Sequence, residues 1–214
     1  MRRLLPAVML FCLGGPLAAQ NATTLAARAS RVYRGLTSMR ASFRQTIEDR
    51  MIGTQESRGE LIQSGNANLV MRFEDPPGDA IVLDGTYVWI YTPSTTPGQV
   101  IRMRMPSDPV YGPNVLGRIL DQPNERYEVG YVRADTAEGR PVDVLEFTPR
   151  AEDPLFRRAV IWLDRVTSLP QRLELDEMTG VHRTLALSRV RTNTPVSPKE
   201  FRFDVPSGVR VVEQ

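Results

Sequence analysis

Residues 67–93 read ANLVMRFEDPPGDAIVLDGTYVWIYTP, and this stretch decides the fold class. Leu69, Met71 and Phe73 alternate with Arg72 and Glu74, which is typical of a strand with one buried face. Asp-Gly at 84–85 separates two further apolar runs, and this pair is the strongest short-range signal for a β-hairpin. The stretch contains no catalytic motif. It therefore predicts an antiparallel sheet with one apolar face, suited to holding an apolar ligand.

The same alternation recurs along most of the chain. Strand patterns cover 43–47, 59–63, 100–105, 127–133, 141–148, 157–163, 170–176 and 181–191, and a last extended segment begins at Phe201. About eleven strands at this spacing favour an antiparallel meander curled into an open, incomplete β-barrel. The pattern argues against a parallel α/β fold because it provides no crossover helices between strands. The sequence predicts a mainly β (α+β) fold.

Two segments have helical rather than strand periodicity. Residues 23–39 place apolar side chains on one helical stripe, and a Pro- and Gly-bounded segment over 114–121 does the same. A helix with a single apolar stripe must cover another apolar surface. We expect both helices to act as lids over a cavity, through Leu25, Tyr33 and Leu36 of the first and Leu116 and Leu120 of the second.

The N-terminus is typical of a secretory signal peptide. Arg2-Arg3 precede an apolar run over 4–13, and Leu17-Ala18-Ala19 offers a small-residue cleavage site. We expect residues 1–19 to be removed, leaving 20–214 as a single domain. Cys12, the one cysteine, would leave with the signal, so the mature chain would have no disulfide. No later apolar run is long enough to span a bilayer, and we expect an exported, monomeric protein of the periplasm.

The charge balance argues against a nucleic-acid partner. The whole chain has 27 Lys and Arg against 25 Asp and Glu, and removal of Arg2 and Arg3 leaves 25 of each. A nucleic-acid-binding protein usually keeps a basic excess on one face. We therefore expect no nucleic-acid binding.

The sequence contains few groups suited to catalysis. His182 is the only histidine, and with no cysteine beside it there is no typical set of transition-metal ligands. The chain has no Gly-x-Ser-x-Gly motif, no phosphate-binding glycine loop and no pattern that calls for a cofactor. We predict neither catalytic residues, nor a metal, nor a cofactor. Carboxylates are plentiful, so a secreted hydrolase with paired carboxylates stays open as an alternative.

Methionine is used where a ligand-binding surface would use it. Met71 lies between Leu69 and Phe73 on one strand face, and Met103 and Met105 lie beside Ile101 on a face of another strand. Methionine is flexible and suits surfaces that repack around varied apolar partners. The pattern fits either an ordinary core or an adaptable cavity, and the sequence alone leaves both open.

The order of several motifs resembles the LolA family of periplasmic lipoprotein carriers. These motifs are MRASFRQ at 39–45, GEL at 59–61, MRFEDP at 71–76, VLDGTYVWIYTP at 82–93 and FRFDVPSGV at 201–209. The resemblance spans about 24–212. It implies an open barrel with helical lids over an apolar cavity that holds the acyl chains of lipoproteins on their way from the inner to the outer membrane. It also implies an inner-membrane release complex and an outer-membrane receptor as partners.

One position departs from the family pattern. In family members an Arg-Pro pair usually follows the strand that begins with GEL, and the arginine bonds to lid carbonyls and helps control opening. Gly65 stands at that place here, and Arg72 is the candidate substitute for this latch. The departure leaves a carrier or sensor of another periplasmic lipid as an alternative function.

These considerations select the expected binding residues. The predicted cavity wall comprises Leu61, Leu69, Met71, Phe73, Trp89, Met103 and Met105. A face assignment wrong by one residue would replace Trp89 with Val88 and Ile90, because strand side chains alternate between faces.

Overall fold

The computed structural model describes residues 15–65, 67–105, 114–153 and 155–214. Most of the predicted signal peptide, with Cys12, lies outside the described residues, as does the loop 106–113. Among the described residues, no helix combines the length and apolar character needed to cross a membrane.

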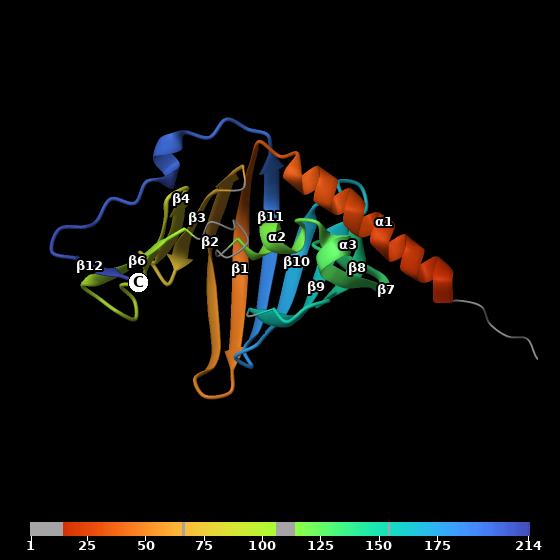
Figure 1. The fold of residues 1–214 in the computed structure, drawn as a ribbon. Coiled ribbons are helices and arrows are strands. Elements are labelled where there is room, and N and C mark those ends of the chain that lie inside the picture. The colour runs from red at the N-terminus through yellow and green to blue at the C-terminus, as the bar shows by residue number, and fades with distance from the viewer. Residues whose placement is uncertain (1–14, 66, 106–113, 154) are drawn as a thin grey trace, which may run out of the picture.

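The described chain forms one open sheet of twelve strands (Figure 1). The order across the sheet is β12-β6-β5-β4-β3-β2-β1-β11-β10-β9-β8-β7, so β12 and β7 are its edges and the sheet does not close. The strands are β1 (Ser38–Asp49), β2 (Gly53–Ser64), β3 (Asn68–Asp75), β4 (Ala80–Asp84), β5 (Tyr87–Tyr91), β6 (Gln99–Arg104), β7 (Tyr127–Ala137), β8 (Arg140–Pro149), β9 (Phe156–Asp164), β10 (Pro170–Glu177), β11 (His182–Thr192) and β12 (Arg210–Glu213).

The predicted open antiparallel sheet is confirmed, with one change at its edge. β12 pairs with β6 in parallel, whereas the other neighbours pair antiparallel. The last segment, predicted to be extended from Phe201, instead passes through the short 3₁₀ helix η1 (Pro198–Phe201) before β12 begins. The chain can join the sheet in parallel there because the long connection from β11 returns across the molecule.

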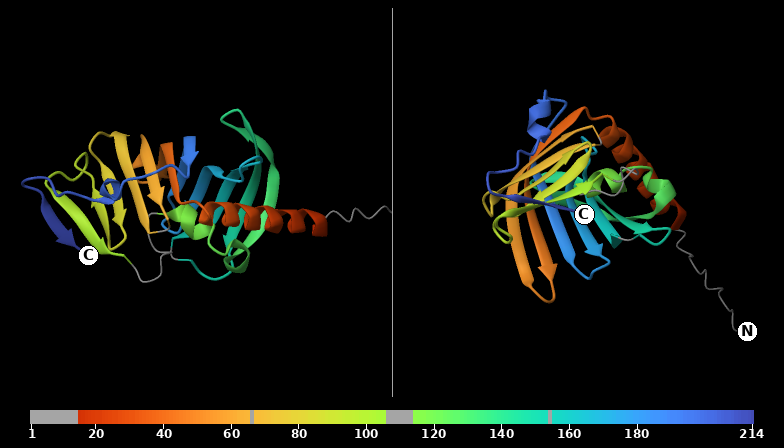
Figure 2. Two further views of the ribbon diagram at one scale, coloured as in Figure 1. Left: turned by 90° about the horizontal axis from the view of Figure 1, so that it is seen from above. Right: turned by 60° about the vertical axis from the view of Figure 1, so that its left-hand side comes forward.

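Three helices lie on one side of the sheet (Figure 2). They are α1 (Gly15–Arg34), α2 (Val115–Ile119) and α3 (Pro123–Arg126). The first helix was predicted to run to residue 39, but it ends at Arg34, and Met39 lies in β1. It packs against β7 and α3 through Ala22, Ala26 and Ala29, which are fully buried. Small side chains let its backbone approach the sheet closely.

The sheet buries apolar side chains on both of its faces. The helix-covered inner face contains the main core, which includes Leu61, Leu69 and Leu83. Alternate residues of the same strands, such as Ile62, Val70 and Val82, belong to a second cluster on the outer face, together with Phe201 of the C-terminal segment. The C-terminal segment, residues 193–214, runs from the end of β11 to the β6 edge (Figure 1). It therefore gives the outer face of β2–β6 an apolar cover.

The turn after β9 is organised by a buried carboxylate, Asp164, whose side chain is 1% exposed. It accepts hydrogen bonds from the backbone N–H groups of Val166 and Thr167 and forms an ion pair with Arg140 at 2.5 Å. Burial by itself raises the pKa of this carboxyl. The hydrogen bonds and the charge of Arg140 outweigh burial, so the pKa of Asp164 lies below its ordinary value.

This lowered pKa predicts how stability depends on pH. Because the folded-state pKa lies below the unfolded value of about 3.9, the stabilisation by Asp164 is complete above that pH. It is lost as the pH falls through the folded-state pKa. We expect Asp164→Asn to lower the free energy of unfolding at pH 7 by about 1–2 kcal/mol and to weaken the acid dependence below pH ~4. Urea unfolding between pH 7 and 3 measures both, and a variant with the wild-type acid dependence would contradict the assignment.

Candidate functional site

An apolar cavity of about 410 Å³ lies between the inner face of the sheet and α2. Its size falls within the usual range of ligand sites, roughly 300–1,000 Å³. The wall comes from β1–β6 on one side and from β9–β11 on the other. The apolar lining residues are Tyr33, Leu61, Leu69, Met71, Ile81, Val88, Ile90, Met103, Val115, Leu116, Leu155, Phe156, Leu173, Leu175 and Leu185.

Several of the predicted wall and lid residues meet at this cavity. Leu61, Leu69, Met71 and Met103 are in its wall, and Tyr33 and Leu116 are in its lining from the helical side. The other predicted residues on this face contact the surrounding core instead. Leu120 is fully buried in it, and Phe73, Met105, Leu25 and Leu36 pack against it.

The placement of Trp89 in the cavity wall was wrong. Trp89 lies on the outer face, where its ring stacks on Phe203 with centroids 5.4 Å apart and its Nε1 donates to Asp84 at 2.8 Å. Its neighbours Val88 and Ile90 line the cavity. Alternation fixed which residues share a face but did not distinguish the faces, because the C-terminal segment makes the outer face of β5 apolar as well.

The sequence reasoning also missed the wall formed by β9, β10 and β11. Leu173 of β10 lies across from Leu185 of β11, and Leu175 lies across from Arg183. All three leucines line the cavity. The signal was present, because these leucines occupy alternate positions of two consecutive strands. The local pattern does not reveal that β11 pairs with β1. This pairing joins both halves of the sheet into one wall.

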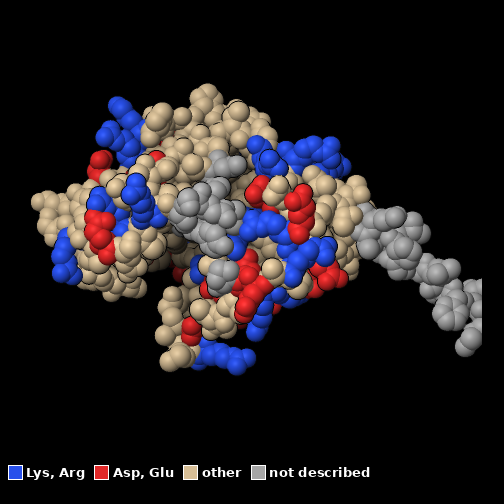
Figure 3. All heavy atoms as spheres, in the orientation of Figure 1, with Lys and Arg blue, Asp and Glu red and all other residues tan. Residues whose placement is uncertain are grey.

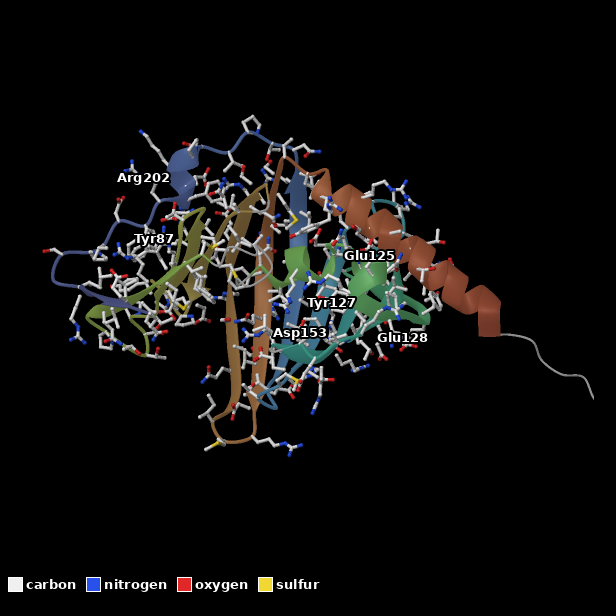
Figure 4. The ribbon with its side chains drawn as sticks, in the orientation of Figure 1. Tyr87, Glu125, Tyr127, Glu128, Asp153 and Arg202 are labelled. Atoms are coloured by element: carbon white, nitrogen blue, oxygen red, sulfur yellow. The ribbon has the colours of Figure 1, made fainter. Side chains whose placement is uncertain are left out.

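A buried ion pair holds α2, the helix predicted to act as a lid. Arg118 donates through Nη2 to Asp153 Oδ2 at 2.5 Å, and the two side chains are 2% and 7% exposed. Figure 4 shows Asp153 below α2, on the segment that leads into β9. Asn114 caps the N-terminus of α2 by accepting from the Gly117 N–H at 2.9 Å. A helix of five residues has little stability alone, so these contacts hold it in place.

A buried polar group joins the first helix to the sheet beside α2. The Tyr33 hydroxyl donates to Gln63 Oε1 at 2.6 Å and lies 3.4 Å from Asn114 Oδ1. Burial raises the pKa of Tyr33 above its ordinary value, so the phenol stays protonated and able to donate. Gln63 in turn donates to the Gly65 carbonyl at 2.9 Å. The contact between β2 and the lid elements is therefore made by Gln63, two residues before Gly65.

Arg72 is not the lid latch. It lies on the outer face of β3, where it donates to the Glu200 carbonyl at 2.8 Å and approaches the Glu200 carboxylate at 3.8 Å. Arg40 also bonds to Glu200, at 2.9 Å. Arg72 therefore helps to hold the C-terminal segment. Gly65 has a positive φ of 57°, which favours glycine, so its position is fixed by the turn after β2.

The opposite end of the cavity has a charged border. Arg183 Nε donates to Glu177 at 2.7 Å, and Arg183 Nη1 donates to Gln45 Oε1 at 3.1 Å. All three residues line the cavity, and Arg183 and Glu177 keep 32% and 21% of their side chains exposed. Among the described lining residues Glu177 is the one carboxylate, so the cavity contains no pair of carboxylates for hydrolysis.

The rest of the described surface gives little sign of other chemistry. No three His, Cys, Asp or Glu side chains of the described residues gather closely enough to hold a metal ion. Acidic and basic side chains are interspersed on the face shown in Figure 3.

A groove of about 380 Å³ on the outer face of β7–β10 is lined by Trp162, Arg133 and Arg172. Its Asp135 accepts from Thr136, Trp162 and Arg133, which together hold the pKa of that carboxyl below its ordinary value.

Known proteins share this sequence pattern over most of its length. A family model described as outer membrane lipoprotein carrier protein LolA matches residues 34–204. The outer-membrane lipoprotein carrier protein of Chromohalobacter salexigens is 25% identical over 205 residues, which cover 93% of this chain and 91% of the relative. The carrier protein of Halorhodospira halophila is 26% identical over 182 residues, with 85% and 82% covered.

Solved structures show the same fold. An uncharacterized conserved protein from Thermus thermophilus is similar with a TM-score of 0.58 at 13% identity, covering 91% of this chain and 100% of that one. That likeness supports the fold alone. The match to the family model spans β1 to β11, α2 and every described cavity-lining residue except Tyr33. The chain therefore belongs to the LolA family of outer membrane lipoprotein carrier proteins.

Proposed function

We propose that this protein carries acylated lipoproteins through the periplasm and holds their acyl chains in the cavity beneath α2. The observation that carries the proposal is the apolar cavity itself, with its methionine-containing wall and the short helix α2 at its roof. Family membership supports the cargo class, since the named relatives are lipoprotein carriers. The protein acts by binding and release rather than by catalysis.

The energetics of the cargo explain why a cavity is required. Burial of one CH₂ contributes about 0.8 kcal/mol, so an acyl chain of about 16 carbons resists transfer to water by on the order of 12 kcal/mol. Three such chains stay in a membrane unless a carrier offers comparable apolar area. The carrier must also release the chains, so their binding has to be opposed by an unfavourable change within the carrier. Displacement of α2 and of the core around it is that unfavourable change.

The attachment of α2 suits such an exchange. In the closed structure Leu116 fills space at the cavity roof, and the Arg118–Asp153 pair fixes the helix. When acyl chains enter, they replace the contacts that Leu116 gives up. The free-energy difference between the two states is then small, and transfer runs toward the tighter binder without nucleotide hydrolysis. An inner-membrane release complex and an outer-membrane receptor are the donor and acceptor that this scheme requires.

The first prediction from this proposal concerns release of cargo from cells. Purified protein added to spheroplasts that synthesise lipoproteins is expected to move outer-membrane lipoproteins from the inner membrane into the soluble fraction. Immunoblots of that fraction give the measurement. If all lipoproteins stay on the inner membrane, the carrier role is wrong. If protein isolated from the periplasm contains phospholipid and no lipoprotein by mass spectrometry, the cargo is another lipid.

A second prediction concerns the cavity wall. We expect Met71→Asp to weaken binding of an apolar fluorescent dye by at least about tenfold, because a carboxylate in the wall must lose its hydration when the dye enters. Met51→Asp is the matched control, since Met51 is 93% exposed at the β1–β2 turn, and it should bind as the wild type does. Met103→Asp tests the same wall from a half-buried position if Met71→Asp folds poorly. Unchanged binding by both wall variants would remove these residues from the site.

A third prediction concerns the lid attachment. Arg118→Met leaves the Asp153 carboxylate buried without its partner, and we expect it to lower the free energy of unfolding by about 3–5 kcal/mol. The double change Arg118→Met with Asp153→Asn removes both charges and should recover most of the loss. Urea unfolding measures stability, and stopped-flow dye binding should show faster entry in the double variant. Equal stability of single and double variants would contradict a lid fixed by this pair.

A further inference from the structure

The two ends of the cavity differ in charge. At one end, Tyr33, Gln63 and Asn114 are buried and uncharged, and their hydrogen bonds connect lid elements to the sheet. At the other end, Arg183 and Glu177 are charged and partly exposed to solvent. The apolar wall lies between them. A ligand in this cavity therefore meets solvent beside one ion pair.

Three adjacent strands create that charged end in the same way. The inward positions of β10 run Leu173, Leu175, Glu177, and those of β11 run Leu187, Leu185, Arg183. In β1 the inward position after Phe43 is Gln45. On each strand, large apolar side chains give way to a polar one at the border of the cavity. This is a defined change in lining chemistry rather than a scatter of surface charges.

The contacts within this border leave hydrogen-bonding capacity for a ligand. Arg183 uses Nε for Glu177 and Nη1 for Gln45. A guanidinium has more N–H donors than these two bonds employ. The lid is held elsewhere, by Arg118 and Asp153, so the border pair is not needed to fix α2. Its inward position would be costly for a cavity that took only hydrocarbon.

We propose that Arg183 and Glu177 form a polar subsite that binds the uncharged ester and amide groups of an acylated ligand and disfavours anionic headgroups. The inference rests on the proposed function, since it assumes that acyl chains occupy the cavity. Arg183 donates to carbonyl oxygens next to the chains, which run inward along Leu175 and Leu185. Glu177 neutralises the guanidinium, so a phosphate gains little net attraction and still loses hydration.

The subsite gives this chain a means of selecting among lipids that share the same acyl chains. The anchor of a lipoprotein joins its chains through ester and amide groups, which carry no charge. A phospholipid joins its chains through the same kind of uncharged ester but adds an anionic phosphate on the third glycerol carbon, where the lipoprotein anchor has a thioether. The ion pair therefore acts as a specificity determinant, and the charge of Glu177 is the part that excludes the anion.

The test compares two amphiphiles with the same acyl chain, a neutral monoacylglycerol and an anionic lysophosphatidylglycerol. Each is titrated below its micelle concentration into full-length mature protein loaded with an apolar dye. For the wild type we expect the monoacylglycerol to displace the dye at about tenfold lower concentration. Glu177→Gln keeps the shape and leaves Arg183 with an unbalanced charge. It should strengthen lysophosphatidylglycerol binding by about tenfold and leave monoacylglycerol within about twofold.

Arg191→Gln is the matched control, because Arg191 lies on the same strand, is exposed and is outside the cavity lining. It should leave both affinities unchanged, and thermal unfolding should verify that each variant is folded. Equal displacement by both lipids in the wild type, or an unchanged ratio in Glu177→Gln, overturns the subsite while leaving acyl binding intact. Failure of both lipids to displace the dye overturns acyl binding itself, and the subsite with it.

Discussion

The structure depends on one constraint, which is that a single open sheet must bury apolar side chains on both of its faces. The outer face of β2–β6 is covered by the C-terminal segment, which Arg40 and Arg72 hold through Glu200. The inner face is covered by helices. Because α1 packs through alanines and α2 has five residues, the helices do not fill the space above the central strands. The cavity is the volume left over, and its walls are the inner side of the sheet.

The polar groups around the cavity form two separate sets, one at α2 and one at the solvent border. Arg118 and Asp153, with Asn114, hold a lid helix that is too short to be stable alone. Arg183 and Glu177 lie on the sheet at the solvent border, where they bond to each other and not to α2. Closing the cavity and selecting what enters it are therefore assigned to different residues, so each can change without the other.

Much of the fold followed from the sequence because alternation and turn residues are local signals. The hairpin at Asp84-Gly85 and the helix over 115–119 form where the sequence predicts them. The errors had a common origin in contacts between distant segments. Trp89 was assigned to the wrong face because Phe203, more than a hundred residues later, makes its side of β5 apolar. Arg72, the candidate latch, instead bonds to Glu200, and this partner could not be found locally because it lies far away in the sequence.

By itself the sequence determined the fold class, the two helical segments and the alternating sets of side chains, because each depends on neighbours within a few residues. It also determined the family through the order of its motifs. Only the tertiary structure decided which set faces the cavity, which residues hold the lid and where the charged border lies. These outcomes depend on the pairing of β1 with β11 and on the return of the C-terminal segment. Alternation is symmetric between the two faces of a strand, and only long-range packing breaks that symmetry.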